Sequence, residues 1–120
     1  MLIPHLYFNG RSREAIAQYV QAFGAKVKEV IPYPEGEQTI GVMHSEISIH
    51  GQRIMLNDNN FGPLCLVVIY ETVEELMRSF EIMKEGGEVT APMIETDYSP
   101  CVAGLCDRFG IDWAFMVRKT

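Results

Sequence analysis

The chain has 120 residues, 48% of them hydrophobic, and its 10 basic and 16 acidic side chains give a net charge of −6. A chain of this length forms one domain and buries a core without disulfides or structural metals. Its acidic balance, with no cluster of lysines and arginines, argues against nucleic acid and anionic membranes as partners, and no apolar run approaches the roughly 20 residues that cross a bilayer.

The same order of predicted elements occurs twice: a strand, an amphipathic helix that ends at glycine, and three strands. The first copy comprises Ile3–Phe8, Ser12–Phe23, Lys26–Tyr33, Ile40–Ile49 and Arg53–Asp58. The second comprises Leu64–Glu71, Thr72–Glu85, Glu88–Ile94, Val102–Cys106 and Trp113–Arg118. We therefore predict an α+β fold in which a single domain, 1–120, contains tandem βαβββ modules, about 1–60 and 63–120. Two such modules pack against each other and enclose a cavity suited to a small molecule.

Capping residues predict where both helices begin and end. Ser12 is expected to cap the first helix by accepting a backbone N–H of the first turn, and Gly24 supplies the left-handed exit. Thr72 and Glu75 have the spacing of a capping box at the start of the second helix. Gly86 and its neighbouring glycine end that helix.

A hairpin is predicted around His50. A two-residue turn at Gly51–Gln52 would pair Ser48 with Met55 and Glu46 with Asn57, although other short turns change the pairing. Strand alternation places Ile47, Ile49, Ile54 and Leu56 toward the helices. The opposite, polar side then holds His44, Glu46, Ser48, Arg53, Met55 and Asn57, together with His5 and Tyr7 of the first strand.

The three cysteines lack CxxC or zinc-site spacing, which indicates reduced thiols in a cytoplasmic protein. Cys65 is predicted to be a small buried residue. Cys101 and Cys106 are expected in an irregular stretch before the last strand. The segment Glu95–Pro100 is expected to be a turn-rich loop.

Several segments, in this order and spacing, resemble a known superfamily. They are Pro4–Gly10, Glu14–Ile16, Phe23–Ala25, Val42–Glu46, Ile54–Asp58, Glu85–Gly87 and Asp107–Trp113. The chain is similar to the vicinal oxygen chelate superfamily of glyoxalase I, bleomycin-resistance proteins and extradiol dioxygenases, and more narrowly to its PhnB-like branch. The resemblance implies a glyoxalase/bleomycin-resistance-like open barrel and a homodimer.

Metal-dependent members of this superfamily take ligands from the first, fourth, fifth and eighth strands. By position these places fall on His5, Met55, Cys65 and Ala114, of which only His5 suits a hard divalent ion. A catalytic metal is therefore not expected, although a rearranged site that adds His44 and Glu46 is the alternative. The methyltransferase label given to the branch finds no support, because the chain lacks a GxGxxG fingerprint.

The sequence thus predicts a protein that binds an unidentified small molecule in the cavity between its modules, without a catalytic metal. The alternative is a divalent-metal-dependent lyase, isomerase or dioxygenase. Glu46 is a candidate to orient the imidazole of His44, and Tyr98 stands where the branch often has a cavity-mouth tryptophan. The candidate ligand-binding residues are His5, Tyr7, His44, Glu46, Asn57, Cys65, Tyr98 and Asp112.

Overall fold

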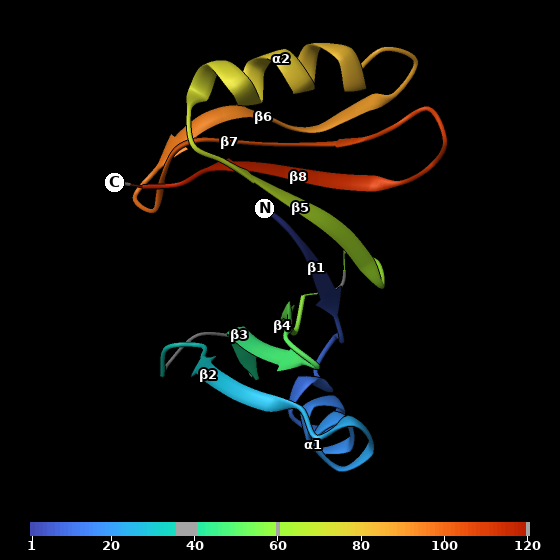
Figure 1. Ribbon diagram of the computed structural model, residues 1–120, viewed down its shortest axis with the longest axis vertical. Coiled ribbons are helices and arrows are strands. Elements are labelled where there is room, and N and C mark those ends of the chain that lie inside the picture. Colours follow the sequence, from blue (N-terminus) through green and yellow to red (C-terminus); the bar gives the residue numbers. More distant parts are fainter. Residues whose placement is uncertain (36–40, 60, 120) are drawn as a thin grey trace. The chain divides into compact units, whose positions relative to one another are not determined.

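The computed structural model describes residues 1–35, 41–59 and 61–119, and its elements follow the predicted order twice (Figure 1). The chain divides into two compact units. We call Ile3–Leu64 the N-terminal unit, and Met1–Leu2 with Cys65–Thr120 the C-terminal unit. Each is an α+β unit of one helix and four strands, so the predicted tandem βαβββ architecture is confirmed.

The N-terminal elements are β1 (Leu2–Tyr7), α1 (Ser12–Phe23), β2 (Lys26–Pro32), β3 (Val42–Ile49) and β4 (Gln52–Asn57). Their strands lie in the order β2-β3-β4-β1, with β1 parallel to β4 and the other pairs antiparallel. Ile40, the predicted first residue of the third strand, lies outside the described residues. The core of this unit contains Ile16, Ala25, Ile47 and Leu56, with Leu6, Phe8 and Ile54 packed around them.

The C-terminal elements are β5 (Leu64–Tyr70), α2 (Val73–Met83), β6 (Glu88–Thr96), β7 (Ser99–Cys106) and β8 (Asp112–Val117). The strand order, β5-β8-β7-β6, repeats the N-terminal topology, with β5 parallel to β8. Helix α2 covers one face of this sheet (Figure 1). The core on that face contains Leu76, Phe80, Cys101, Ala103, Leu105, Phe115 and Val117.

Two predictions for the stretch before the last strand are wrong. Cys101 and Cys106 lie in the regular strand β7 and not in an irregular stretch, because alternate residues of this strand fill the core under α2. The predicted strand Val102–Cys106, which already contained Cys106, is confirmed and begins three residues earlier, at Ser99. The predicted loop Glu95–Pro100 is mostly strand as well. Thr96 pairs with Ser99, so only Asp97 and Tyr98 remain as the turn between β6 and β7.

The predicted cap of α1 is also wrong. Ser12 is the first helical residue, and its hydroxyl donates to Oδ1 of Asp58 (2.6 Å). The same oxygen accepts the backbone N–H groups of Gly10 (3.0 Å) and Ser12 (2.9 Å), while Oδ2 accepts that of Val42 (2.7 Å). Burial opposes ionisation of Asp58, yet these hydrogen bonds hold its pKa below the usual value. A carboxylate 46 residues away therefore holds the start of the helix.

At α2 the local prediction is confirmed. Thr72 Oγ1 accepts the backbone N–H of Glu75 (3.2 Å) and donates to the Glu75 carboxylate (2.9 Å). The predicted exit of α1 is confirmed too, since Gly24 adopts a left-handed conformation at φ 65°. Neither of these helices, in the described part of the chain, has the length and apolar run that crossing a bilayer requires.

The hairpin between β3 and β4 turns one residue earlier than the two-residue turn considered above. His50 and Gly51 both have positive φ angles, 50° and 84°, as a tight hairpin turn requires. Ser48 therefore pairs with Arg53, and Glu46 pairs with Met55. The pairing shifts by two residues, so each side chain keeps the face that alternation predicted.

Candidate ligand-binding face

The side of the N-terminal sheet opposite α1 carries charged, polar and aromatic residues. Leu6, Ile47 and Leu56 pack in the core beside α1, so their neighbours along each strand lie on the other side. We call that side the polar face. Its residues are Lys26, Lys28 and Glu29 of β2, His44, Glu46 and Ser48 of β3, Arg53, Met55 and Asn57 of β4, and His5 and Tyr7 of β1.

One row of paired residues crosses the polar face. His5 pairs with Met55, Met55 with Glu46, and Glu46 with Glu29. Neighbouring strands are spaced by about 4.8 Å, so His5 and Glu46, two strands apart, are separated by about 10 Å. The row thus joins an end at β1 to an end at β2.

The β1 end is aromatic. The rings of His5 and Tyr7 stack with their centroids 4.5 Å apart and an interplanar angle of 18°. Phe61 meets Tyr7 edge-on, with a centroid distance of 5.7 Å, and is itself 74% exposed. The stacked pair of His5 and Tyr7 offers a ring face on which another planar ring can stack, and Phe61 stands edge-on beside it.

His5 also contributes a hydrogen-bonding atom. Its Nδ1 is buried and has no hydrogen-bond partner within residues 1–35, 41–59 and 61–119. Burial, with a smaller contribution from nearby His44, lowers the pKa of His5 from 6.5 to about 4. The imidazole is therefore neutral at pH 7, with one nitrogen unsatisfied. A buried polar atom left in this way costs about 1–3 kcal/mol.

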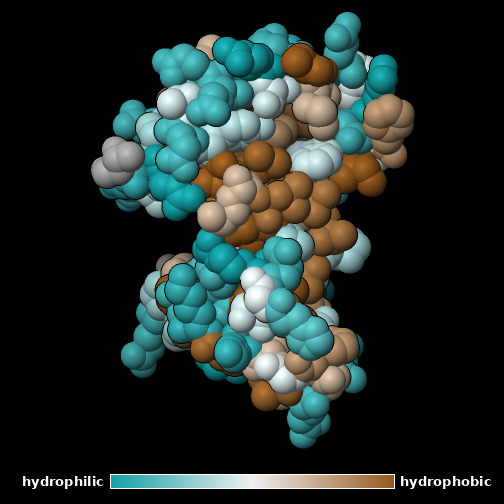
Figure 2. All heavy atoms as spheres, viewed as in Figure 1, coloured by the Kyte–Doolittle hydropathy of each residue, from teal (hydrophilic) through white to brown (hydrophobic). Residues whose placement is uncertain are grey.

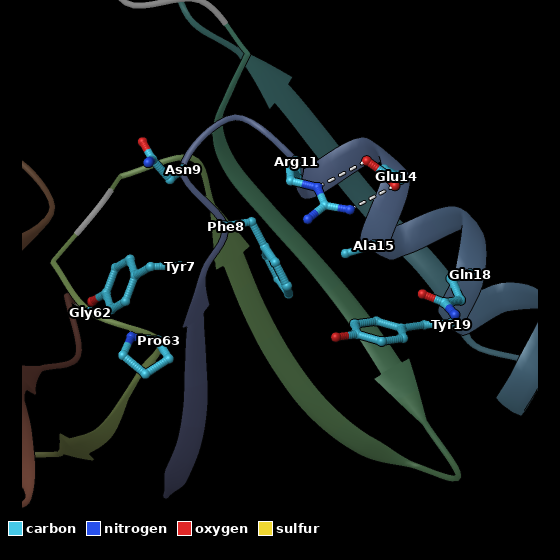
Figure 3. Close-up of a pocket in the computed structure, with 10 residues that line it drawn as sticks. All are labelled: Tyr7, Phe8, Asn9, Arg11, Glu14, Ala15, Gln18, Tyr19, Gly62 and Pro63. Atoms are coloured by element: carbon cyan, nitrogen blue, oxygen red, sulfur yellow. Dashed lines mark hydrogen bonds and ion pairs between the residues drawn. The ribbon is translucent and has the colours of Figure 1, made fainter.

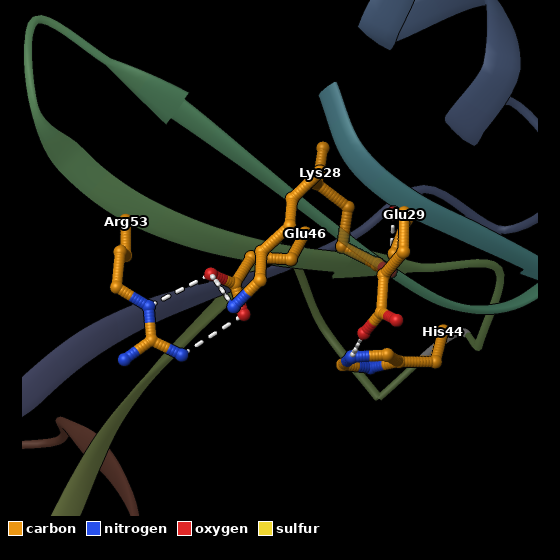
Figure 4. A network of polar contacts seen from close by, with 7 residues as sticks. Lys28, Glu29, His44, Glu46 and Arg53 are labelled. Atoms are coloured by element: carbon orange, nitrogen blue, oxygen red, sulfur yellow. Dashed lines mark hydrogen bonds and ion pairs between the residues drawn. The ribbon is translucent and has the colours of Figure 1, made fainter. Parts of the chain in front are cut away.

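The β2 end is charged (Figure 4). Arg53 donates from Nε and Nη2 to the two carboxylate oxygens of Glu46, at 2.7 and 3.0 Å, and Lys28 Nζ lies 3.7 Å from Glu46 Oε2. The hydrogen bond from Arg53 is the main cause of a lowered pKa at Glu46, which stays ionised although only 5% exposed. His44 contacts Glu29, with Nε2 3.3 Å from Oε1. The carboxylate beside His44 is thus Glu29, whereas Glu46 is held by Arg53.

A β-bulge explains why Lys28 and Glu29 share this face. Val27 pairs with Ile47 and Glu29 pairs with Glu46, so Lys28 is an extra residue in β2. An extra residue breaks the alternation of side chains and redirects the strand locally. As a result Lys28 reaches Glu46 while the adjacent Glu29 reaches His44.

The remaining candidate of this unit has a structural contact. Asn57 pairs with Tyr7 across β4 and β1, and is 8% exposed. Its Oδ1 accepts the backbone N–H of Asn59 at 3.0 Å, which fixes the loop after β4. The structure therefore brings five of the predicted residues onto one face, and those five are His5, Tyr7, His44, Glu46 and Asn57.

The other three candidates belong to the C-terminal unit. Cys65 is buried in β5, as predicted. Tyr98 lies at the turn between β6 and β7 and is 62% exposed. Asp112 begins β8 and accepts a hydrogen bond from the thiol of Cys106, whose pKa is raised first by burial and then by Asp112.

The positions that the resemblance assigns to a metal do not fit a hard divalent ion. Met55, the residue paired with His5, offers only a thioether sulfur, and Ala114 offers no donor. Glu46, the alternative ligand, has both oxygens engaged by Arg53. Within the described residues, no three His, Cys, Asp or Glu side chains are grouped to hold an ion.

Sequence reasoning missed a pocket of about 520 Å³ between the end of β1 and the first turns of α1 (Figure 3). Phe8 and Tyr19 approach each other inside it, and the Arg11–Glu14 ion pair (2.9 Å) lies on its rim. Tyr7 belongs to both this pocket and the polar face. No charge pattern or motif in the sequence indicates this pocket.

Lys26, Lys28 and Phe61 were also missed as candidates. Basic residues spaced i, i+2 on one predicted strand were a signal for the two lysines. The contact of Lys28 with Glu46 depends on a bulge, which alternation does not foresee. Phe61 lies in the loop after β4, where no periodicity places a side chain.

Comparisons with known proteins agree with this fold. The sequence model of the family described as 3-demethylubiquinone-9 3-methyltransferase matches residues 1–116. Protein YjdN of Escherichia coli K12 is 26% identical over 140 aligned positions, which cover 98% of this chain and 95% of that protein.

Solved structures show the same fold. A Staphylococcus aureus protein of 24% identity superimposes with a TM-score of 0.86, covering 98% of this chain and 96% of that one. A glyoxalase/bleomycin resistance protein/dioxygenase superfamily member from Vibrio splendidus gives a TM-score of 0.63 at 15% identity, covering 99% and 98% of the two chains.

Proposed function

The chain belongs to the 3-demethylubiquinone-9 3-methyltransferase family, which is the PhnB-like branch of the glyoxalase/bleomycin resistance/dioxygenase superfamily. On this basis we propose that its polar face binds a small molecule that contains a ring, without a catalytic metal. Members of the superfamily bind small molecules and often form dimers. The ligand class follows from the chemistry of the face.

The observation that carries the proposal is the buried, unpartnered Nδ1 of His5 beside a stacked Tyr7. A ligand ring stacks on the aromatic group formed by His5, Tyr7 and Phe61. A ligand hydroxyl both donates and accepts, so it satisfies Nδ1 in either tautomer and removes the cost of the unsatisfied nitrogen.

Calorimetric titration with 4-phenyl-1-butanol tests this proposal, because the alcohol combines a planar ring with one neutral hydroxyl. For so small a ligand we expect a dissociation constant on the order of 1 mM. His5→Phe keeps a stacking ring but removes the nitrogen, and Tyr7→Leu removes the ring. Each change should weaken binding about fivefold or more.

Tyr98→Leu is the matched comparison for Tyr7→Leu, because the same change is made at an exposed tyrosine of the C-terminal unit. It should leave the affinity unchanged. If Tyr7→Leu and Tyr98→Leu lost affinity for the alcohol equally, the alcohol would not be bound specifically at the polar face. The ligand-binding roles of Cys65, Tyr98 and Asp112 remain predictions.

We also propose that the chain acts as a cytoplasmic homodimer. The cytoplasm keeps thiols reduced, which suits the buried Cys65 and Cys101. Strands β2 and β6 each end the strand order of their unit and expose apolar residues such as Val27 and Ile94, and exposed strand edges favour association. Light scattering at micromolar concentration should give twice the mass of 13.6 kDa; a monomer mass would contradict the dimer.

A further inference from the structure

We infer that the molecule bound at the polar face carries an oxyanion, a carboxylate or a phosphate group, which Lys26 and Lys28 bind at the β2 end. This inference rests on the proposed function, because it names the chemical class of the ligand for the same face. It comes from a separate observation, a pocket whose charge is opposite to that of the whole chain.

That pocket has a volume of about 400 Å³ and lies at one end of β2, β3 and β4. Its lining includes three cations, Lys26, Lys28 and Arg53, and one anion, Glu46. Three positive charges and one negative charge leave a local charge of +2, whereas the chain as a whole carries −6. We call this the basic pocket.

Glu46 is not shared equally among the three cations of the basic pocket. Arg53 binds both oxygens of Glu46, so these two residues neutralise each other. Lys28 Nζ is 3.7 Å from a Glu46 oxygen that already accepts a hydrogen bond from Arg53. Lys26, in the part of the chain that the structure describes, forms no ion pair. Glu29 contacts His44 and does not line the pocket.

The two lysines therefore supply ammonium groups that an oxyanion can bind. Ser48, which pairs with both Lys26 and Arg53, adds a hydroxyl to the lining. The aromatic end of the polar face lies about two strand spacings, or 10 Å, from Glu46. Lys26 and Lys28 lie one strand further, on β2, about three strand spacings or 14 Å from β1 at the backbone. The side chain of Lys28 extends back over β3 and brings Nζ to 3.7 Å from Glu46 Oε2. A ligand whose ring lies on His5 and Tyr7 and whose chain crosses Met55 would therefore meet the lysines near Glu46.

Three ligands that share a phenyl ring on a short chain but end in different groups test the inference. 4-Phenylbutanoate carries a carboxylate where 4-phenyl-1-butanol carries a hydroxymethyl group, and 3-phenylpropyl phosphate carries a phosphate at similar reach. At low salt the wild-type protein should bind at least one of the two anions about tenfold more tightly than the alcohol. The anion with the larger preference identifies the group that the pocket suits.

The double variant Lys26→Gln/Lys28→Gln should lose this preference while its affinity for 4-phenyl-1-butanol stays the same. Lys84→Gln is the matched control, since Lys84 pairs with Glu81 on α2 and is far from β2 in the sequence; this variant should keep the preference. Raising the salt concentration from about 20 to 300 mM should reduce the preference in the wild-type protein.

An unchanged preference in the lysine variant would overturn the inference, as would equal binding of the alcohol and both anions. In either case, binding of the alcohol that depends on His5 and Tyr7 would leave the proposed function standing. If neither the alcohol nor the anions bind, the proposed function fails together with the inference.

Discussion

The two units share one topology but present different chemistry on the side of the sheet opposite the helix. In the N-terminal unit that side is the polar face. In the C-terminal unit Val68 and Phe115 pack under α2, so the alternate residues of β5 and β8 lie on the other side. Those residues are Cys65, Val67 and Ile69 of β5, and Asp112, Ala114 and Met116 of β8, so Asp112 is their one charged member. Figure 2 shows hydrophobic residues gathered over β5 and β8.

The same units also start their helices differently. Helix α1 is held by Asp58, which accepts four hydrogen bonds from three residues distant in sequence. Helix α2 is held by Thr72, its immediate neighbour. The repeated fold therefore depends on core packing, which both units have, whereas helix capping and the open sheet face can differ. Stacked aromatic rings and a charged network therefore occupy the sheet face of the N-terminal unit.

The largest expected effect is a difference in stability between variants at the starts of the two helices. Asp58→Ala leaves the N–H groups of Gly10, Ser12 and Val42 without their acceptor, and should lower the free energy of unfolding by about 3–4 kcal/mol. Thr72→Ala removes one local cap and should cost about 1 kcal/mol. Urea unfolding of both variants measures the difference, and equal losses would contradict the assignment of Asp58.

The second effect is a pH dependence confined to the polar face. The folded pKa of His5, about 4, lies below its unfolded value of 6.5. Between these values the unfolded chain binds the extra proton, so stability falls as pH falls from 6.5 toward 4. From pH 7 to pH 5 the free energy of unfolding should drop by about 2 kcal/mol on account of His5 alone.

His5→Phe should remove this part of the pH dependence in urea unfolding at pH 7 and pH 5. His50→Asn is the control, because His50 lies exposed in a turn with positive φ that asparagine tolerates; this variant should keep the wild-type pH dependence. If the free energy of unfolding fell equally between pH 7 and pH 5 in His5→Phe and in the wild-type protein, His5 would not be buried in its neutral form.

A smaller effect concerns the charged end of the polar face. Glu46→Gln breaks the bidentate pair with Arg53 and should lower stability by about 1 kcal/mol, since Arg53 is partly exposed and regains water. Asp112→Asn, at an exposed carboxylate of the C-terminal unit, should change stability by less than about 0.5 kcal/mol. Thermal unfolding of the two variants compares the two sheet faces directly, and equal effects would argue against a structural role for the Glu46 pair.

The smallest expected effect is the response to metals. The protein is first treated with EDTA and then given Ni²⁺, Zn²⁺ or Mn²⁺ at about 0.1 mM. Its Tm should change by less than about 0.5 °C, because a metal site with a dissociation constant above about 1 mM stabilises the folded state very little. A shift of several degrees with any of these ions would show that the donors around His5 form a metal site.

The sequence predicted the parts of the fold that depend on local periodicity. Helix Ser12–Phe23 has the predicted bounds, and Ile47 and Leu56 lie in the core as alternation requires. The prediction for Ser12 failed because its partner, Asp58, is 46 residues away. The hairpin pairing stayed open in the sequence because it depends on the turn, and the turn forms at His50–Gly51, where His50 adopts a left-handed conformation although it is not a glycine.

For the candidate site, as for the fold, the sequence predicted what depends on local periodicity and missed what depends on long-range contacts. Alternation placed His5, Tyr7 and Glu46 on one side of the sheet, because that side depends only on the strand period. The partner of Glu46 depends on which residues are neighbours across strands, and the role of Lys28 depends on a bulge. The missing hydrogen bond at His5 Nδ1 is a property of the packed structure and has no sequence signal.

The most direct measurement is a ¹H–¹⁵N NMR titration of the EDTA-treated protein with 4-phenyl-1-butanol. Binding at the polar face predicts that the shift changes cluster on His5, Tyr7 and Met55 and in the loop around Phe61, with none of similar size in β6 or at Tyr98. Shift changes centred on the C-terminal unit, or changes that appear only after a divalent metal is added, would contradict metal-free binding at this face.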